Sequence, residues 1–218
     1  MKITKEKYMT DNFTSFRNFM QLPETEGGDA YYVIELVRRG KDCPELSAAN
    51  YHFKNYYIDT LKKYDKVKDE IRLLCRTLRL RAYVSVTRKS FRRVTLGTIA
   101  EMSRRAFLDD YRRPYAVFES VSGKDVSKDD KYWVVDIDDC MFNTRESVQK
   151  RANIIRVITE CEPKGSKLEM MLPTRTGTHI ITRPFNLEQF IRLCSEDPKV
   201  AEVPDIKKNH LTLLFEDL

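Results

Sequence analysis

Alternating and near-helical spacings of apolar residues predict both strands and helices in the first half of the chain. Residues 30–38 follow the Gly27-Gly28-Asp29 turn and are rich in β-branched and aromatic side chains, so we expect a strand there. Residues 81–87 alternate in the same way and predict a second strand. Helices are predicted from three sets of apolar positions: Phe53, Tyr57, Leu61 and Tyr64; Val67, Ile71, Leu74 and Leu78; and, within residues 96–108, Leu96, Ile99, Ala100, Ala106 and Phe107.

The second half of the chain predicts six short elements in the order βαββαβ. The strands are expected at residues 132–138, 167–172, 178–183 and 211–215. A helix that Asn143 caps, with Glu146 three residues later, is expected to run to about Cys161. A second helix is expected after Asn186, with Gln189 completing the same capping pattern.

This order of elements predicts an α+β fold. In ferredoxin-like and RRM-like modules, a βαββαβ chain forms an antiparallel sheet that carries helices on one face and leaves the other for ligands. We expect such a palm over residues 126–218, with an N-terminal α/β portion, residues 1–125, packed on it. The fold class by itself indicates no particular function.

Composition and cysteine usage narrow the class of protein. With 218 residues, 41% of them hydrophobic and 33% charged, the chain is typical of a globular protein, and no apolar run is long enough to span a membrane. We therefore expect no membrane partner, and the lack of an apolar stretch behind Met1-Lys2-Ile3 favours the cytoplasm. The five cysteines include no Cys-x-x-Cys pair, so we expect reduced thiols rather than a zinc site.

The net charge of +6 is compatible with a polyanionic partner, and basic residues crowd between residues 72 and 113. Such a density of positive charge is typical of a surface that follows a phosphate backbone, although the solvated face of a helix explains it equally well. The candidates for nucleic-acid contact in this stretch are Arg81, Arg88, Lys89, Arg92 and Arg93.

Candidate chemistry begins with Asp136 and Asp138, which end the apolar strand 132–138. Because side chains alternate along a strand, we expect these two carboxylates side by side on one face. Neighbouring carboxylates repel each other unless a cation lies between them, and Mg²⁺ or Mn²⁺ is the usual cation. A solvent-facing acidic turn is the alternative for an isolated Asp-x-Asp, so the interpretation needs other segments.

Two later segments support the metal interpretation. Residues 174–181 place Arg175, Gly177 and His179 in a turn and the following strand, and residues 204–209 place Asp205 before two lysines. With the Asp-x-Asp strand, they resemble the three catalytic motifs of the archaeo-eukaryotic primase superfamily, which includes primase-polymerases and proteins like the small primase subunit. The resemblance covers roughly residues 130–218, and Gly177 stands where many members have serine.

The resemblance implies a DNA primase or primase-polymerase that transfers nucleotides from nucleoside triphosphates onto a strand directed by single-stranded DNA. Asp136, Asp138 and Asp205 would bind two Mg²⁺ or Mn²⁺ ions, with Glu216 or Asp217 as the rival third carboxylate. The residues implied in binding the triphosphate are Arg175, Thr176, Thr178, His179, Arg183, Lys207 and Lys208. A helicase or another replication protein would be a further partner of such an enzyme.

Two other functions are compatible with the same residues. A metal-dependent nuclease or phosphohydrolase also clusters aspartate and histidine, and it would shorten DNA without added nucleotide. A non-catalytic nucleic-acid-binding module would keep a primase-like palm but would bind no metal at Asp136.

Overall fold

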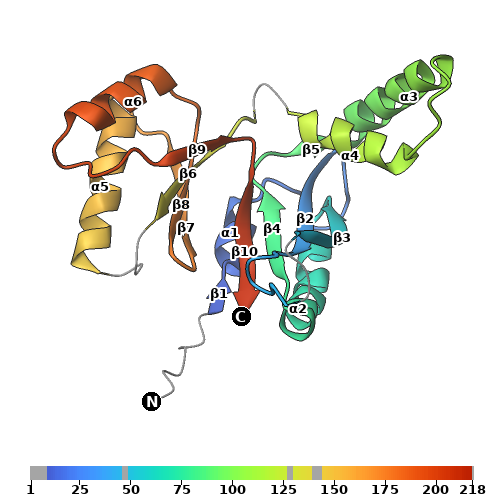
Figure 1. The fold of residues 1–218 in the computed structure, drawn as a ribbon, viewed down its shortest axis with the longest axis horizontal. Coiled ribbons are helices and arrows are strands. Elements are labelled where there is room, and N and C mark those ends of the chain that lie inside the picture. Colours follow the sequence, from blue (N-terminus) through green and yellow to red (C-terminus); the bar gives the residue numbers. More distant parts are fainter. Residues whose placement is uncertain (1–8, 46–48, 127–129, 139–143, 218) are drawn as a thin grey trace.

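The structure is a computed structural model that describes residues 9–45, 49–126, 130–138 and 144–217. Over these residues it is a mixed α+β fold with six helices and two antiparallel sheets (Figure 1). The helices and antiparallel sheets confirm the predicted α+β class. No helix in this part of the chain is long and apolar enough to cross a membrane.

The larger sheet has six strands and brings the first and last described strands together. Its order is β1 (Met9–Asp11), β10 (Leu211–Asp217), β4 (Arg81–Ser85), β2 (Ala30–Arg38) and β3 (Tyr51–Ile58), and β5 (Lys89–Ser90) also pairs with β2. Met9 pairs with Asp217, and on the other side of β10 Leu213 pairs with Tyr83. β10 therefore lies inside this sheet, between β1 and β4.

Two helices, α1 (Phe13–Phe19) and α2 (Leu61–Leu78), cover one face of the larger sheet. α2 begins where the Thr60 hydroxyl accepts a hydrogen bond from the backbone N–H of Lys63. The core between these helices and the sheet includes Phe13, Phe16, Tyr32, Ile34, Leu36, Tyr64, Ile71, Cys75, Val84, Leu214 and Phe215. These two helices do not cover the opposite face of the sheet, which lines part of a cleft.

The smaller sheet has four strands, in the order β7 (Leu168–Thr174), β8 (Gly177–Thr182), β6 (Trp133–Asp138) and β9 (Asp205–Lys208). Helices α5 (Arg145–Glu160) and α6 (Leu187–Glu196) cover one face, on the left of Figure 1. Val135, Ile137 and Ile180 pack against Ile154 and Phe190 in the core beneath these helices. Because neighbouring side chains alternate in a strand, the residues between them point to the opposite face.

A small apolar cluster joins the two sheets. Tyr132, Val134 and Ile181 of the smaller sheet's uncovered side pack with Val86 and with Phe19 of α1. The ring centroids of Phe19 and Tyr132 lie 5.1 Å apart with an edge-on geometry. The chain itself also connects the sheets, because β9 of the smaller sheet leads directly into β10 of the larger one.

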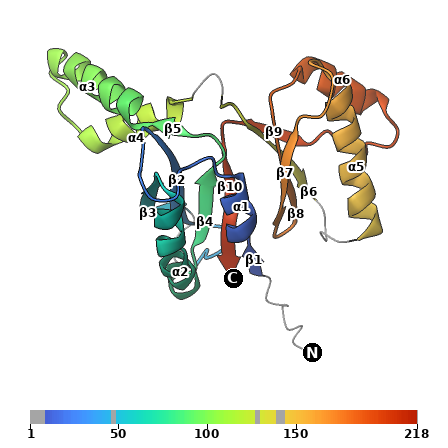
Figure 2. The same cartoon turned by 180° about the vertical axis from the view of Figure 1, so that it is seen from behind.

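The hairpin of α3 (Phe91–Phe107) and α4 (Pro114–Lys124) projects from the larger sheet, as Figures 1 and 2 show from opposite sides. Ser90 caps α3 by accepting a hydrogen bond from the backbone N–H of Arg93. At the foot of the hairpin, Phe91 stacks on Tyr31 with ring centroids 4.1 Å apart. The outer part of the hairpin lies away from both sheets.

Several predicted elements are confirmed. The strands expected at 30–38, 81–87, 132–138, 167–172 and 178–183 correspond to β2, β4, β6, β7 and β8. The helices expected over 67–78, 96–108, before Cys161 and after Asn186 correspond to α2, α3, α5 and α6, and Asn186 does cap α6. The four described cysteines, Cys43, Cys75, Cys161 and Cys194, are buried and free.

Other predictions need correction. Phe53 and Tyr57 lie in strand β3 and not in a helix. The strand expected at 211–215 exists as β10, but it pairs in the larger sheet, and β9 takes the last place in the smaller one. Asn143 lies outside the described residues, and Thr144 caps α5 by accepting from the backbone N–H of Ser147. The elements β1, α1, β5, α4 and β9 were not predicted.

Candidate active site

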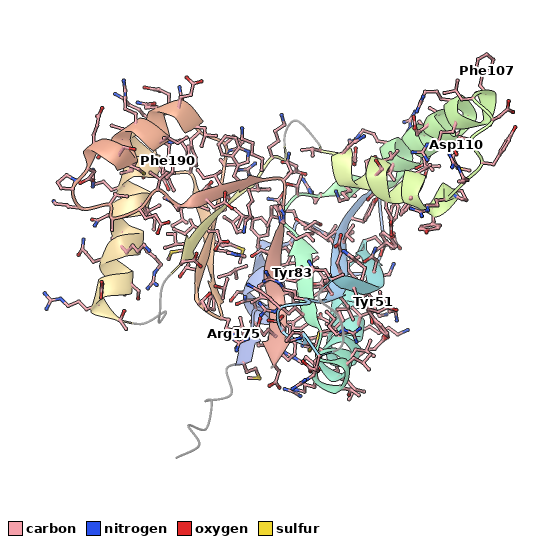
Figure 3. All side chains as sticks on the ribbon, viewed as in Figure 1. Tyr51, Tyr83, Phe107, Asp110, Arg175 and Phe190 are labelled. Carbon is pink, nitrogen blue, oxygen red and sulfur yellow. The ribbon has the colours of Figure 1, made fainter. Side chains whose placement is uncertain are left out.

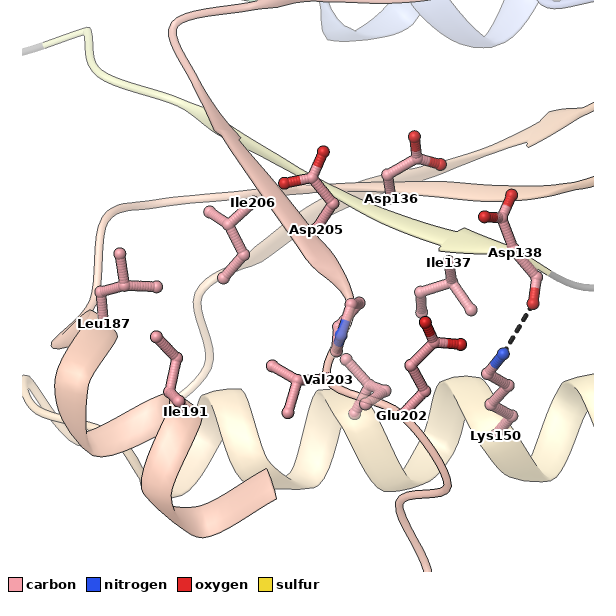
Figure 4. A pocket seen from close by; sticks show the side chains of 12 residues that line it. Asp136, Ile137, Asp138, Lys150, Leu187, Ile191, Glu202, Val203, Asp205 and Ile206 are labelled. Atoms are coloured by element: carbon pink, nitrogen blue, oxygen red, sulfur yellow. Dashed lines mark hydrogen bonds between the residues drawn. The ribbon is translucent and has the colours of Figure 1, made fainter. Parts of the chain in front are cut away.

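Asp136 and Asp138 lie on β6, on the face of the smaller sheet that α5 and α6 do not cover. Figure 4 shows both carboxylates, with that of Asp205, extending to one side of the strands while Ile137 and Ile206 extend toward the helices. The apolar alternation of β6 causes this, because burying Val135 and Ile137 under α5 turns both aspartates outward. The expectation that these two side chains share a face is met.

Asp136 is held between an ammonium and an imidazole. Lys207 Nζ lies 2.6 Å from Asp136 Oδ2, and His179 Nε2 lies 3.3 Å from Asp136 Oδ1. The hydrogen bond with His179, followed by that from Lys207, holds the pKa of the Asp136 carboxyl well below its usual range, although partial burial opposes the shift. Asp136 is therefore ionised at neutral pH.

A second residue orients the His179 ring. His179 Nδ1 lies 2.9 Å from the hydroxyl oxygen of Thr212, which is fully buried on β10. A neutral imidazole with its proton on Nε2 would donate to Asp136 and accept from the Thr212 hydroxyl, so that both contacts are satisfied. Thr212 connects the site to the larger sheet, and the sequence motifs gave no sign of it.

Asp205 lies on β9, directly opposite Asp136 in the pairing of the two strands. Directly opposite residues share a face, so its carboxylate joins the same side of the sheet. Asp205 Oδ2 lies 3.9 Å from the Lys207 ammonium, and its side chain is 72% exposed. The lysine thus lies near two of the three carboxylates.

The rival carboxylates lie elsewhere. Glu216 is fully buried on β10, where it is in ion-pair contact with Arg81 at 2.8 Å. Asp217 lies 2.7 Å from Arg76 of α2. Both therefore belong to the larger sheet, and Asp205 is the third carboxylate on the face that carries Asp136 and Asp138.

A cleft of about 720 Å³ opens over this face. One side is lined by Asp136, Asp138, His179 and Lys207 of the smaller sheet, together with Arg175 and Thr176 of the β7–β8 turn. The other side is the uncovered face of the larger sheet, including Glu35, His52, Arg81 and Tyr83. Arg175 and Thr176 thus line the same cleft as the carboxylates, as their place in the sequence motif predicted.

The wall of the cleft beside Arg175 contains a buried ion network. Arg81 makes two hydrogen bonds of 2.7 Å to the carboxylate of Asp42 and also contacts Glu216. Arg175 lies 4.0 Å from Asp42 and 3.8 Å from Glu216, so it is attracted by both without being tightly bound. Burial raises the pKa of Glu216, although the charges of Arg81 and Arg175 oppose the shift. Arg175 lines the cleft beside this network, with its side chain 35% exposed.

A second hollow, of about 550 Å³, lies on the α5–α6 side of the same carboxylates. Figure 4 shows its apolar lining from Leu187, Ile191 and Val203, with Lys150 at the rim. Lys150 Nζ donates to the backbone carbonyl of Asp138 at 2.6 Å. This contact fixes the end of β6, where the two aspartates lie.

Three of the predicted phosphate ligands lie apart from the cleft. Thr178 is fully buried on the helix side of β8, where it accepts a hydrogen bond from Arg151. Lys208 lies over the ring of Trp133, and Arg183 donates to Glu169 at 2.6 Å. Thr178 and Lys208 each neighbour a cleft residue in sequence, so alternation sends them to the opposite face.

Most basic side chains of residues 81–93 form ion pairs or hydrogen bonds with other residues of the protein. Arg81 is paired with Asp42 and Glu216, Arg88 with Asp130, and Arg93 with Asp125. The Lys89 ammonium donates to the carbonyl of Ser122, and burial lowers the pKa of Lys89. Of the five predicted nucleic-acid contacts, Arg92 is exposed on α3. Arg88 pairs with a residue 42 positions away in the sequence, and Arg93 with one 32 positions away. Such distant partners could not be recognised from the sequence.

In the described part of the chain, no three histidine, cysteine or acidic side chains are close enough together to enclose a metal ion. Asp136 is engaged by Lys207 and His179, and the side chain of Asp205 is 72% exposed.

Comparison with protein-family models, with curated proteins and with solved structures finds no match to this chain.

Proposed function

We propose that the chain is a template-directed nucleotidyltransferase of the primase or primase-polymerase type. The observation that carries the proposal is the arrangement of Asp136, Asp138 and Asp205 on one uncovered face of the smaller sheet, with His179 against Asp136. These residues come from three separate segments of the chain, and all of them except Asp205 line the cleft that Arg175 also lines. Nucleotidyl transfer needs such an acidic site facing cationic groups that receive phosphates.

The topology of the smaller sheet supports the proposal. Its elements follow the order β6, α5, β7, β8, α6, β9, and its strands lie in the order β7-β8-β6-β9 with both helices on one face. A ferredoxin-like palm has the same order of elements and the same placing of helices. In this reading the palm ends at β9, and the archaeo-eukaryotic primase superfamily is the proposed family.

The residues present fit divalent cations in their chemistry. Mg²⁺ and Mn²⁺ prefer carboxylate oxygens, which Asp136, Asp138 and Asp205 provide. The Lys207 ammonium, 2.6 Å from Asp136 and 3.9 Å from Asp205, already lies where a positive charge is favourable. When bound, the metal ions would supply the charge that stabilises the attacking and leaving oxygens.

The chain's own residues would position the nucleotide. Arg175 and Thr176, which line the cleft in the β7–β8 turn, are placed to receive phosphate oxygens. His179 is oriented by Thr212 and keeps Asp136 ionised. Lys207 would turn from the carboxylates to the phosphates once cations replace it beside Asp136.

The test is nucleotide incorporation on a single-stranded DNA template, with and without an annealed primer, in the presence of Mg²⁺ or Mn²⁺. Asp136→Asn and Asp138→Asn should each lower incorporation by about 100-fold or more, since each removes charge that faces the transition state. Asp69→Asn is the matched control, because its carboxylate is 86% exposed on α2, outside the cleft. Circular dichroism should show that all three variants remain folded.

Unchanged incorporation in both cleft variants would end the proposal. A labelled strand that shortens without added nucleoside triphosphate would instead identify a metal-dependent nuclease, provided that Asp136→Asn abolishes the cleavage.

One observation favours a second candidate, a non-catalytic nucleic-acid-binding module. Lys207 neutralises Asp136 as an internal counter-ion, which would make a metal ion unnecessary for the fold. Calorimetry with Mn²⁺ distinguishes the two candidates, because the enzyme should bind Mn²⁺ and lose that binding in Asp136→Asn. Steeply salt-dependent DNA binding with no Mn²⁺ binding would favour the module.

A further inference from the structure

The outer end of the α3–α4 hairpin exposes three aromatic side chains. Phe107, Tyr111 and Tyr115 are 89%, 71% and 66% exposed, and they recur every four residues along the chain. None of them makes a ring–ring contact with another described residue. Figure 3 shows Phe107 at the far end of α3, away from the body of the protein. We call residues 104–115 the hairpin tip.

Basic residues outnumber acidic ones along the hairpin that carries these rings. Over residues 91–124 the basic residues are Arg92, Arg93, Arg104, Arg105, Arg112, Arg113 and Lys124, and the acidic ones are Glu101, Asp109, Asp110 and Glu119. Within the tip, Arg104 and Arg105 pair with Glu101 and Arg112 pairs with Asp110. The Arg104 and Arg112 side chains are 61% and 89% exposed, and such exposed pairs are weak enough to exchange for another anion.

The hairpin is continuous with the candidate active site. A hollow of about 560 Å³ lies along α4, where Tyr115, the last residue of the tip, and Phe118 line it together with residues of the larger sheet. This hollow and the cleft that contains Asp136 and His179 share four lining residues, Glu35, His52, His210 and Leu211. A strand that lies in the cleft can therefore continue across the larger sheet and along α4.

We propose that the hairpin tip binds single-stranded nucleic acid, with bases stacked on Phe107, Tyr111 and Tyr115 and phosphates paired with the neighbouring arginines. Every base has a flat face, so stacking on exposed rings binds a strand with little dependence on its sequence. This inference rests on the proposed function only where it identifies the bound strand as the template. The tip binds it without metal ions or nucleotides.

The arginine pairs Arg104-Arg105 and Arg112-Arg113, which lie next to the rings in the sequence, favour nucleic acid over a protein partner. A strand offers a flat base and a negative charge at each nucleotide, which suits exposed rings with arginines near them. Leu96, Ile99 and Met102 are also exposed on α3, and these aliphatic side chains suit a second copy of the chain better than they suit bases. The test below therefore measures self-association as well.

The test uses fluorescence anisotropy of a labelled oligo(dT) strand with the full chain, in buffer containing EDTA and no nucleotide. Phe107→Ala and Tyr111→Ala should each weaken binding by roughly 5- to 150-fold, which corresponds to the loss of one stacked base. Leu73→Ala is the matched control, since it removes a side chain that is 64% exposed on α2. Its affinity should equal that of the unchanged protein.

A second measurement tests the arginines. The double variant Arg112→Ala with Arg113→Asn removes two charges, and asparagine suits the left-handed backbone of Arg113 at φ 51°. The slope of log affinity against log salt should become shallower by about 1.4, since each phosphate contact on a single strand contributes about 0.7. A purely structural role of these arginines would leave the slope unchanged.

The outcomes separate this inference from the proposed function. In the Asp136→Asn background, in which incorporation is lost, Phe107→Ala should still weaken oligo(dT) binding by the same factor. Wild-type affinity in Phe107→Ala and Tyr111→Ala, or no oligo(dT) binding by the unchanged protein, overturns the inference and leaves the proposed function standing. A dimer in sedimentation that dissociates in Phe107→Ala, with DNA binding unaltered, would assign the tip to a second copy and overturn it as well.

Discussion

Two neighbouring side chains keep the carboxylate of Asp136 ionised. His179 and Lys207 both approach its carboxylate, and the pKa of Asp136 is lowered, chiefly by the hydrogen bond with His179. If this carboxylate binds a divalent cation as proposed, the cation would compete with the Lys207 ammonium, which lies 2.6 Å from Asp136 Oδ2. The proposed cation binding would therefore require Lys207 to move.

The lowered pKa of Asp136 predicts a pH dependence of stability. Because the folded protein holds this proton less tightly than the unfolded chain, the contribution of Asp136 is present above its ordinary pKa of about 4 and falls below it. The difference in unfolding free energy between the unchanged protein and Asp136→Asn should thus shrink from pH 5 to pH 3. Urea unfolding with EDTA at pH 7, 5, 4 and 3 measures it, and a difference that stays constant over this range would contradict the prediction.

Alternation explains which site residues could be predicted from the sequence. Asp136, Asp138, His179 and Lys207 were found because motif spacing and strand parity agree at these positions. Thr178 and Lys208 do not line the cleft. Each is next in sequence to a residue that points into the cleft, so its own side chain points to the opposite face of the sheet. Thr212 could not have been found, since it reaches His179 from a strand of the other sheet.

At the scale of elements, the ion network of Arg81 connects three separate parts of the chain. Arg81 on β4 bonds to Asp42, which follows β2, and contacts Glu216 on β10. All three side chains are almost completely buried. A buried pair adds little by its formation, but removing one member leaves an uncompensated charge.

Replacing Arg81 should therefore destabilise the larger sheet strongly. Arg81→Leu leaves Asp42 and Glu216 buried without their cation, and we expect a loss of about 3–5 kcal/mol in unfolding free energy. Arg79→Ala is the control, because its pair with Glu45 is exposed and should contribute about 0–1 kcal/mol. Chemical denaturation measures both variants. Equal stability of the two would show that the network is not stabilising.

Elements were predicted best where only one periodicity fits. β2, β6 and α6 have clear patterns and clear boundaries, and all three are confirmed. Phe53 and Tyr57 were misleading, because residues four apart share a face in a strand as well as in a helix. The apolar alternation of β10 predicted a strand but not its partners, since periodicity does not indicate which sheet a strand joins.

At the scale of the whole molecule, the cleft lies between two sheets that share little core. An apolar cluster around Tyr132 and Phe19 joins them, and the β9–β10 connection crosses from one to the other. Asn209 makes that connection with a left-handed backbone at φ 52°, a conformation that asparagine tolerates. Asp205 and Thr212, on either side of it, thus contribute to one site from two sheets.

Removing residues 210–218 should prevent the larger sheet from folding. β10 lies between β1 and β4 and brings Leu214 and Phe215 into the main core, where loss of such side chains costs about 2–5 kcal/mol each. That sum approaches the whole stability of a typical domain, about 5–15 kcal/mol. Near-ultraviolet circular dichroism and thermal melting measure the outcome. A truncated protein with the melting curve of the full chain would contradict the prediction.

The position of β10 also sets an order of events during synthesis on the ribosome. β1 is made early, yet its lateral neighbour is a strand that emerges roughly two hundred residues later. The four strands β6 to β9 are complete before that point, so the smaller sheet can form while β1 and β4 still await the strand that joins them. Nascent chains should therefore expose the apolar side of the unfinished larger sheet until translation passes residue 217, and this interval is when they would need a chaperone.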